Sequence, residues 1–85
     1  MLPEFAQAYY NRGNVYVKLS DFKSAVVDYT KAIELDDNLA AAYFNRGLAR
    51  IYLGDKDEGV ADLSKAGELG IYAAYNVIKR FSDKE

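Results

Sequence analysis

The 85-residue chain has neither cysteine nor histidine, and these absences exclude several kinds of site. Without cysteine, the chain can form neither a disulfide nor a thiolate metal site. Without histidine, it lacks the most common general base and the most common zinc ligand. We therefore expect no catalytic residue, no metal and no cofactor, and we interpret the protein as a non-enzyme.

Long apolar runs and a large excess of one charge are also missing. No apolar run reaches the ~18 residues that suggest a membrane-spanning helix, and the first residues, MLPEFAQ, are too polar and too few for a secretory signal peptide. The net charge of −2 creates no strong field for nucleic acid or anionic lipid. We expect neither nucleic acid nor a membrane among the partners, and we expect a cytoplasmic location.

The residues that are present have the composition of one small globular domain. Hydrophobic residues make up 51% of the chain and charged residues 28%, which is enough apolar material for a modest core. A chain of this size buries about two-thirds of the surface that it exposes when unfolded. We interpret residues 1–85 as a single domain.

A 34-residue internal repeat is the strongest pattern in the sequence. Residues 6–35 and 40–69 align without a gap and are identical at fourteen of thirty positions, against roughly two expected for unrelated segments. The identical pairs include Asn11/Asn45, Arg12/Arg46, Gly13/Gly47, Asp21/Asp55 and Asp28/Asp62. We infer a tandem duplication, with repeat one at about 6–39 and repeat two at about 40–73.

Each repeat has the apolar spacing of two helices. In repeat one, Phe5, Tyr9, Tyr16 and Leu19 share one side of a first helix. A second helix follows the cap candidate Asp21 and carries Phe22, Ala25, Val26, Tyr29, Ala32 and Ile33 on one side. A fifth helix is predicted at about 72–81, and no period-two alternation indicates a strand. The predicted fold is therefore all-α, with five helices.

Several residues are predicted to begin or end these helices. Asp21 is a suitable N-cap, and the Asp36–Asn38 segment both breaks the pattern and supplies caps. Asp55 with Glu58 has the spacing of a capping box, and Gly70 suits the end of the fourth helix.

The glycines of the repeated Asn-Arg-Gly lie in the middle of helices, where each costs about 1 kcal/mol relative to alanine. Their presence at both Gly13 and Gly47 indicates that a neighbouring helix approaches too closely for a Cβ. Gly59 and Gly67 should make the fourth helix the least stable by propensity. For the arginines of the same motif, the sequence suggests no role beyond a partly buried stem.

These patterns resemble the tetratricopeptide repeat family, which has the same period. Repeat one carries Tyr9, Gly13, Tyr16, Ala25, Tyr29 and Ala32 at family positions, and repeat two departs from them at Arg50, Gly59 and Leu63. The resemblance implies a right-handed superhelix (solenoid) of antiparallel helix-turn-helix repeats with a C-terminal capping helix. It also implies a non-catalytic protein–protein interaction module that binds a peptide or a partner protein segment in the concave groove.

Helical geometry defines two opposite sides of each first helix, and the resemblance implies that one of these sides lines the groove. The candidate partner-binding residues are Tyr10, Asn11, Asn14, Phe44, Asn45, Leu48, Tyr52 and Lys79. Two interpretations of Phe44, Leu48 and Ile51 remain open: they pack against neighbouring helices, or they form an apolar pocket for a partner's side chains. Self-association into a homo-oligomer, through this groove or the array ends, is the alternative to partner binding.

Some members of the family hold the C-terminal carboxylate of chaperones with two asparagines, two lysines and an arginine. The resemblance places Asn14 and Asn45 at the amide positions and Lys79 at the arginine position. Tyr10 and Tyr75 stand at the lysine positions. Because charge-assisted contacts are the strong part of carboxylate recognition, we do not expect a working clamp.

Overall fold

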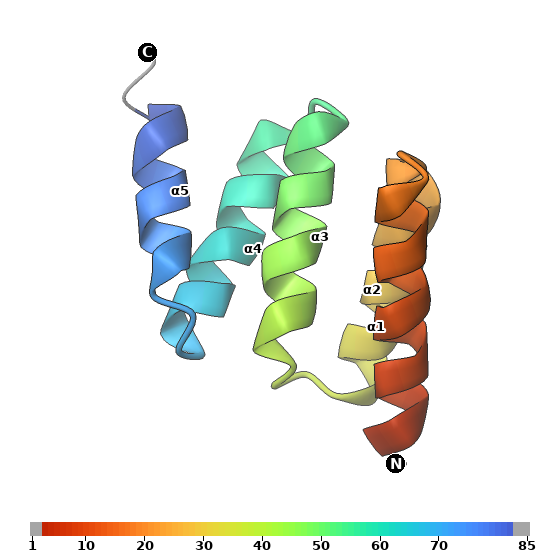
Figure 1. Cartoon of the computed structure of the whole chain (residues 1–85). Helices are drawn as coiled ribbons and strands as arrows, with labels where there is room; N and C mark the ends of the chain where they lie inside the picture. The colour runs from red at the N-terminus through yellow and green to blue at the C-terminus, as the bar shows by residue number, and fades with distance from the viewer. Residues whose placement is uncertain (1–2, 83–85) are drawn as a thin grey trace.

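The computed structural model describes residues 3–82, which form five helices joined by short turns (Figure 1). The helices are α1 (Pro3–Lys18), α2 (Phe22–Leu35), α3 (Ala40–Tyr52), α4 (Lys56–Glu68) and α5 (Ala73–Ser82). These bounds confirm the predicted all-α class and its five helices, and residues 3–82 contain no strand. None of the described helices is both long and apolar enough to cross a membrane.

The helices are arranged as two hairpins followed by a single helix. α1 lies in front of α2 and α3 lies in front of α4, while α5 lies beside α4 at the end of the row (Figure 1). Each helix contacts the next in the chain, and α1 also contacts α3. The molecule measures 41 × 27 × 16 Å, so it is flat, and α1 and α3 form one of its broad faces.

The predicted N-cap of α2 is confirmed. The Asp21 carboxylate accepts hydrogen bonds from the Ser24 backbone N–H at 3.2 Å and from the Ser24 hydroxyl at 2.8 Å. Gly70 directly follows the C-cap residue Leu69 and has a φ of +115°, which glycine adopts without strain. Both ends therefore follow from local sequence chemistry.

Asp36 is the C-cap residue of α2 and Asp55 is the N-cap residue of α4, as predicted, but the side-chain caps expected for α3 and α4 do not form. Asp55 occupies the N-cap position of α4, but its side chain makes no cap hydrogen bond, and Glu58 lies 4.0 Å from Arg50 Nε instead of completing a capping box. α3 begins at Ala40, so its N-cap residue is Leu39, which has no side-chain acceptor. The Asp36 carboxylate accepts from the Asn38 N–H within the preceding turn.

The core consists of two clusters, and each ties a hairpin to the helix that follows it. Completely buried Ala25, Tyr29 and Ala32 of the first hairpin pack with Ala42 of α3. Completely buried Leu63 and Ala66 of the second hairpin pack with Ala74 of α5. The hairpins are therefore joined through α2 and α3, and α5 closes the C-terminal end.

The close helix approach predicted at the repeated glycines is confirmed. A Cβ on Gly13 would lie 2.7 Å from Cε1 of Tyr29, and a Cβ on Gly47 would lie 2.8 Å from the carbonyl oxygen of Gly59. Both distances are well inside van der Waals contact. The tight packing within each hairpin therefore requires glycine at these helical positions.

Candidate functional site

The repeated arginines and aspartates form an equivalent ion pair in each hairpin. Arg12 donates from Nε and Nη2 to the two carboxylate oxygens of Asp28, at 2.7 and 2.9 Å. Arg46 donates in the same way to Asp62, with both distances 2.8 Å. Each pair ties the first helix of its hairpin to the second. Sequence reasoning missed this role, although all four residues recur at the 34-residue period.

Asp62 also holds Arg50, the residue at which repeat two departs from the family pattern. Arg50 Nη1 donates to Asp62 Oδ2 at 2.9 Å, so two guanidinium groups share one buried carboxylate. In the first hairpin, the hydrogen bond to Asp28 and the negative charge of Asp28 raise the pKa of Arg12 above its ordinary value. These charged groups therefore connect the two helices of each hairpin.

A network of amide and phenol groups connects α1 to α3 on the broad face. Asn14 Oδ1 accepts from the Tyr29 hydroxyl and from Asn45 Nδ2, the latter at 3.0 Å. Asn45 Nδ2 also donates to Tyr10 Oη at 3.2 Å. Burial raises the pKa of Tyr29 to about 12, so its hydroxyl remains a donor at neutral pH.

The network leaves one donor group and one acceptor without a protein partner. Asn14 Nδ2 and Asn45 Oδ1 make no hydrogen bond to another residue in the described range 3–82. No buried side-chain nitrogen or oxygen lacks a partner in that range, so these two atoms reach solvent. An amide donor and an amide acceptor are thus available side by side.

A groove pocket opens next to this network. Its lining residues are Asn14, Val17, Lys18, Phe22, Tyr29, Asn45, Leu48, Ala49 and Tyr52. The rings of Phe22 and Tyr52 stack with centroids 4.9 Å apart and an interplanar angle of 15°. Lys18 is the one charged residue of this lining. The pocket therefore offers aromatic surface, free amide groups and one positive charge.

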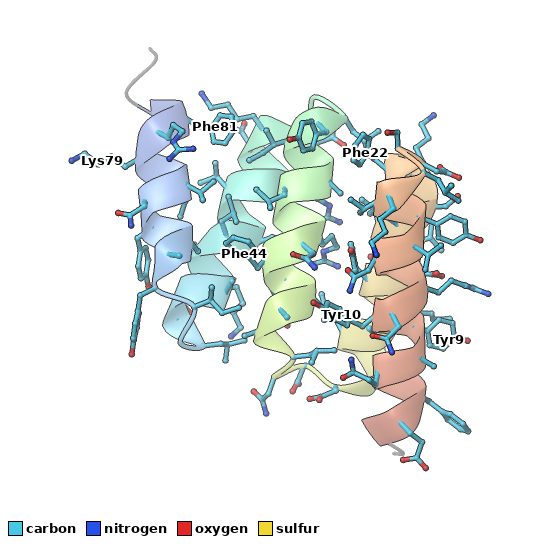
Figure 2. All side chains as sticks on the ribbon, in the orientation of Figure 1. Tyr9, Tyr10, Phe22, Phe44, Lys79 and Phe81 are labelled. Carbon is cyan, nitrogen blue, oxygen red and sulfur yellow. The ribbon has the colours of Figure 1, made fainter. Side chains whose placement is uncertain are left out.

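The structure brings together most of the candidate residues from the sequence. Asn14, Asn45, Leu48 and Tyr52 line the groove pocket. Tyr10 extends from α1 toward α3 and is hydrogen-bonded to Asn45 (Figure 2).

The other three candidates lie elsewhere. Asn11 is exposed and accepts from Gln7 Nε2 at 3.1 Å. Phe44 packs against the second core cluster, as the packing interpretation expected, and Leu48 and Ile51 pack there too. Lys79 points away from α3 (Figure 2).

Five lining residues were not among the candidates: Val17, Lys18, Phe22, Tyr29 and Ala49. Val17 and Lys18 lie on the same helix as Asn14, and their spacing of three and four residues from it was a usable signal. Ala49 lies four residues after Asn45 on α3, so the same signal applied to it. Phe22 and Tyr29 carried no such signal, because both belong to α2 and reach the pocket only through the packing of the hairpins.

The two tyrosines at the lysine positions of a carboxylate clamp are engaged within the protein. The Tyr10 hydroxyl accepts a hydrogen bond from Asn45. The ring of Tyr75 packs over Gly67 of α4, so that a Cβ added to Gly67 would lie 2.5 Å from Cζ of Tyr75. In residues 3–82, no group of three or more acidic side chains is arranged to hold a metal ion. The groove pocket itself offers hydrogen-bonding groups, apolar surface and the charge of Lys18.

Comparison with known proteins agrees with this architecture. Two family profiles described as tetratricopeptide repeat match residues 6–39 and 40–69. Among solved structures, the chain is similar to the first TPR of Spaghetti (RPAP3) bound to the HSP90 peptide SRMEEVD, with 28% sequence identity and a TM-score of 0.86. That similarity covers 93% of this chain and 64% of the other, so this chain spans slightly less than two-thirds of its neighbour's length.

The search of curated proteins gives no significant match. The two profile matches are consecutive and together extend from residue 6 to residue 69, which is most of the chain. Their boundary coincides with the turn between α2 and α3. The chain belongs to the tetratricopeptide repeat family.

Proposed function

We propose that the protein is a non-catalytic protein–protein interaction module that binds a peptide segment of a partner in the groove pocket. The observation that carries the proposal is the pairing of open aromatic surface with a free amide donor on Asn14 and a free amide acceptor on Asn45. Members of the family are generally interaction modules, and the similar TPR of Spaghetti (RPAP3) binds a peptide.

The two free amide groups suit the main chain of an extended peptide. A peptide unit presents a carbonyl acceptor and an N–H donor, which complement Asn14 Nδ2 and Asn45 Oδ1. The stacked rings of Phe22 and Tyr52 offer apolar contact for a partner side chain. Lys18 favours an acidic residue in the bound segment.

The proposed binding mode differs from carboxylate-clamp recognition, in which positively charged side chains bind the peptide's C-terminal carboxylate. Tyr10 and Tyr75 supply no positive charge at the two lysine positions, and Lys79 points away from α3 (Figure 2). Binding through amide and apolar contacts depends only weakly on salt, because just one charged residue lines the pocket. We therefore expect a neutral or weakly acidic peptide to bind, with or without a free C-terminus.

The test uses peptides selected from a library of extended sequences, with SRMEEVD as one defined probe. The Tyr52→Ala substitution should lower the affinity for the selected peptide by about tenfold, as removal of a central aromatic contact does. Tyr72→Ala is the matched control, because Tyr72 and Tyr52 are 74% and 73% exposed and Tyr72 lies outside the groove pocket. Titration calorimetry measures both affinities.

A nuclear magnetic resonance shift map completes the test. The side-chain amide signals of Asn14 and Asn45 should move on binding. Shifts confined to residues outside the groove pocket, such as Lys23 and Lys31, would contradict the groove assignment. Equal weakening by the Tyr52 and Tyr72 substitutions would also contradict it.

A further inference from the structure

A stacked pair of aromatic rings joins the two hairpins at the groove pocket. Phe22, at the start of α2, lies against Tyr52, at the end of α3, with ring centroids 4.9 Å apart and an interplanar angle of 15°. Phe22 extends from α2 toward α3 (Figure 2). Both residues line the groove pocket, so the stack is part of the surface that a bound peptide would contact.

The ring pair does not follow from the internal repeat. At the 34-residue period, the residue equivalent to Tyr52 is Lys18, and the residue equivalent to Phe22 is Lys56. Lysine side chains at these positions cannot form the same stack. The pair therefore belongs to this one junction between α2 and α3, and not to the packing that both repeats share.

Tyr52 is the outer ring of the pair. Phe22 is partly buried, whereas Tyr52 is 73% exposed although Phe22 covers one face of its ring. No other ring in residues 3–82 stacks on Tyr52. The second face of the Tyr52 ring is therefore open to a ligand.

The surroundings of this open ring favour a flat apolar group. Val17, Leu48 and Ala49 give the groove pocket an apolar lining, and Lys18 is its one charged residue. A guanidinium group also stacks on aromatic rings, but the positive charge of Lys18 would repel it. A pair of stacked rings is more stable than the buried area alone accounts for. An aromatic side chain therefore gains more here than an aliphatic side chain of the same size.

We propose that the groove pocket selects partner segments that carry an aromatic side chain, which stacks on the open face of Tyr52 as a third ring beyond Phe22. This inference rests on the proposed function, because it requires that a peptide binds in the groove pocket. It assigns Tyr52 as the residue that determines specificity for a ring. Lys18 disfavours arginine at the same position and favours an acidic residue beside the ring.

The test uses capped peptides of the sequence GSEXESG, which differ only at the central position X. Tryptophan, phenylalanine, cyclohexylalanine and arginine are placed there in turn. Cyclohexylalanine is the matched control for phenylalanine, because it has a ring of similar size without π electrons. The protein contains no tryptophan, so the fluorescence of the tryptophan peptide reports its binding without a tryptophan background from the protein. Titration calorimetry measures the other affinities.

The phenylalanine and tryptophan peptides should bind about threefold to tenfold more tightly than the cyclohexylalanine peptide, as expected for an added aromatic pair. The ring signals of Tyr52 in nuclear magnetic resonance spectra should move upfield with both aromatic peptides and not with cyclohexylalanine. The arginine peptide should bind more weakly than the phenylalanine peptide. Lys18→Gln should narrow that difference.

The protein variants locate the preference on one ring. Tyr52→Leu should remove the preference for phenylalanine over cyclohexylalanine, and Tyr52→Phe should retain it. Tyr72→Leu is the matched control, because Tyr72 is 74% exposed and lies outside the groove pocket. Melting curves check that all three variants remain folded, as we expect for substitutions at exposed side chains.

Two results would overturn the inference and leave the proposed function intact. The first is equal affinity for the phenylalanine and cyclohexylalanine peptides, and the second is an aromatic preference that survives Tyr52→Leu. In both cases the side-chain amide signals of Asn14 and Asn45 would still move on binding. If neither these peptides nor those selected from a library move the two amide signals, the proposed function fails as well.

Two further results would also overturn the inference. One is the absence of binding by the tryptophan peptide under conditions in which library peptides without an aromatic residue bind. The other is a concentration-dependent dimer in sedimentation that Tyr52→Leu abolishes, because that dimer would assign the open ring to a second copy of the chain.

Discussion

At the scale of single residues, the two equivalent ion pairs differ in their access to water. Asp28 and Asp62 are both buried, but Arg12 is mostly exposed and Arg46 is covered by α2. An exposed ion pair adds little to stability. Removing one partner of a buried pair is strongly destabilising, because it leaves an uncompensated charge away from water. The same motif therefore has unequal importance in the two repeats.

Asp62→Asn should lower the free energy of unfolding by about 3 kcal/mol, because it leaves both Arg46 and Arg50 without their carboxylate. Asp28→Asn should cause a smaller loss, since Arg12 keeps its hydration. Urea denaturation measures both changes. Asp37→Asn, in the exposed turn after α2, is the control for loss of one negative charge and should be nearly neutral. Equal losses at Asp28 and Asp62 would contradict this assignment.

At this scale, prediction from sequence succeeded for the question of which residues share one side of a helix, because helical periodicity alone determines it. Spacing placed Asn14, Asn45 and Tyr52 on one side, and the structure places them in one pocket. Sequence spacing did not pair Arg12 with Asp28. Recurrence at the repeat period shows that both residues occur in each repeat, but it does not show which residue contacts which. That contact depends on how two helices cross.

At the scale of helices, the repeat and the apolar spacing predicted the number and extent of the elements. The predicted fifth helix at about 72–81 compares with α5 at Ala73–Ser82. Capping was less predictable, because a carboxylate near a helix end has several competing donors. Glu58 lies near Arg50, and Asp36 binds within its own turn.

The glycines of α4 have a packing role that propensity did not reveal. Gly59 faces Gly47 across the second hairpin, where a Cβ on Gly59 would lie 2.7 Å from the Gly47 carbonyl oxygen. Gly67 lies under the ring of Tyr75. Low helix propensity and close packing therefore occur at the same positions of this helix.

Gly47→Ala should destabilise the protein by about 2 kcal/mol, although alanine favours helix formation. Its Cβ would meet the Gly59 carbonyl oxygen at 2.8 Å and Leu63 Cγ at 3.0 Å, so the backbones of α3 and α4 must separate. Gly67→Ala is the matched substitution, because the three atoms nearest its Cβ all belong to the ring of Tyr75, which is partly exposed and can rotate away. Its effect should stay within about 1 kcal/mol.

Thermal and urea unfolding of the two variants measure this difference. In the Gly67→Ala variant the ring signals of Tyr75 should shift, while the amide signals of α3 stay in place. A Gly47→Ala variant as stable as the unmodified chain would show that α3 and α4 can move apart without loss of stability. It would also refute the explanation given for the repeated glycine.

At the scale of the whole molecule, the two ends of the array are closed to different degrees. At the C-terminal end, Ala74 is completely buried, and Val77 and Ile78 of α5 pack against the second core cluster. At the N-terminal end, Phe5 and Ala8 are exposed. In a repeat array, stability comes from each unit and from its contacts with the next. Within residues 3–82, the second hairpin therefore has packing neighbours on both sides and the first hairpin on one.

The double substitution Val77→Ala and Ile78→Ala tests how much the closed end contributes. It should lower the free energy of unfolding by about 2 kcal/mol, since both side chains are only partly buried and their neighbours can relax. Hydrogen exchange should accelerate first in α5 and α4, which α5 contacts, and only later in α1 and α2. Asn76→Ala, at an exposed position of the same helix, should change neither measurement. Uniform acceleration across all five helices would mean that the array unfolds as one unit, without nearest-neighbour steps.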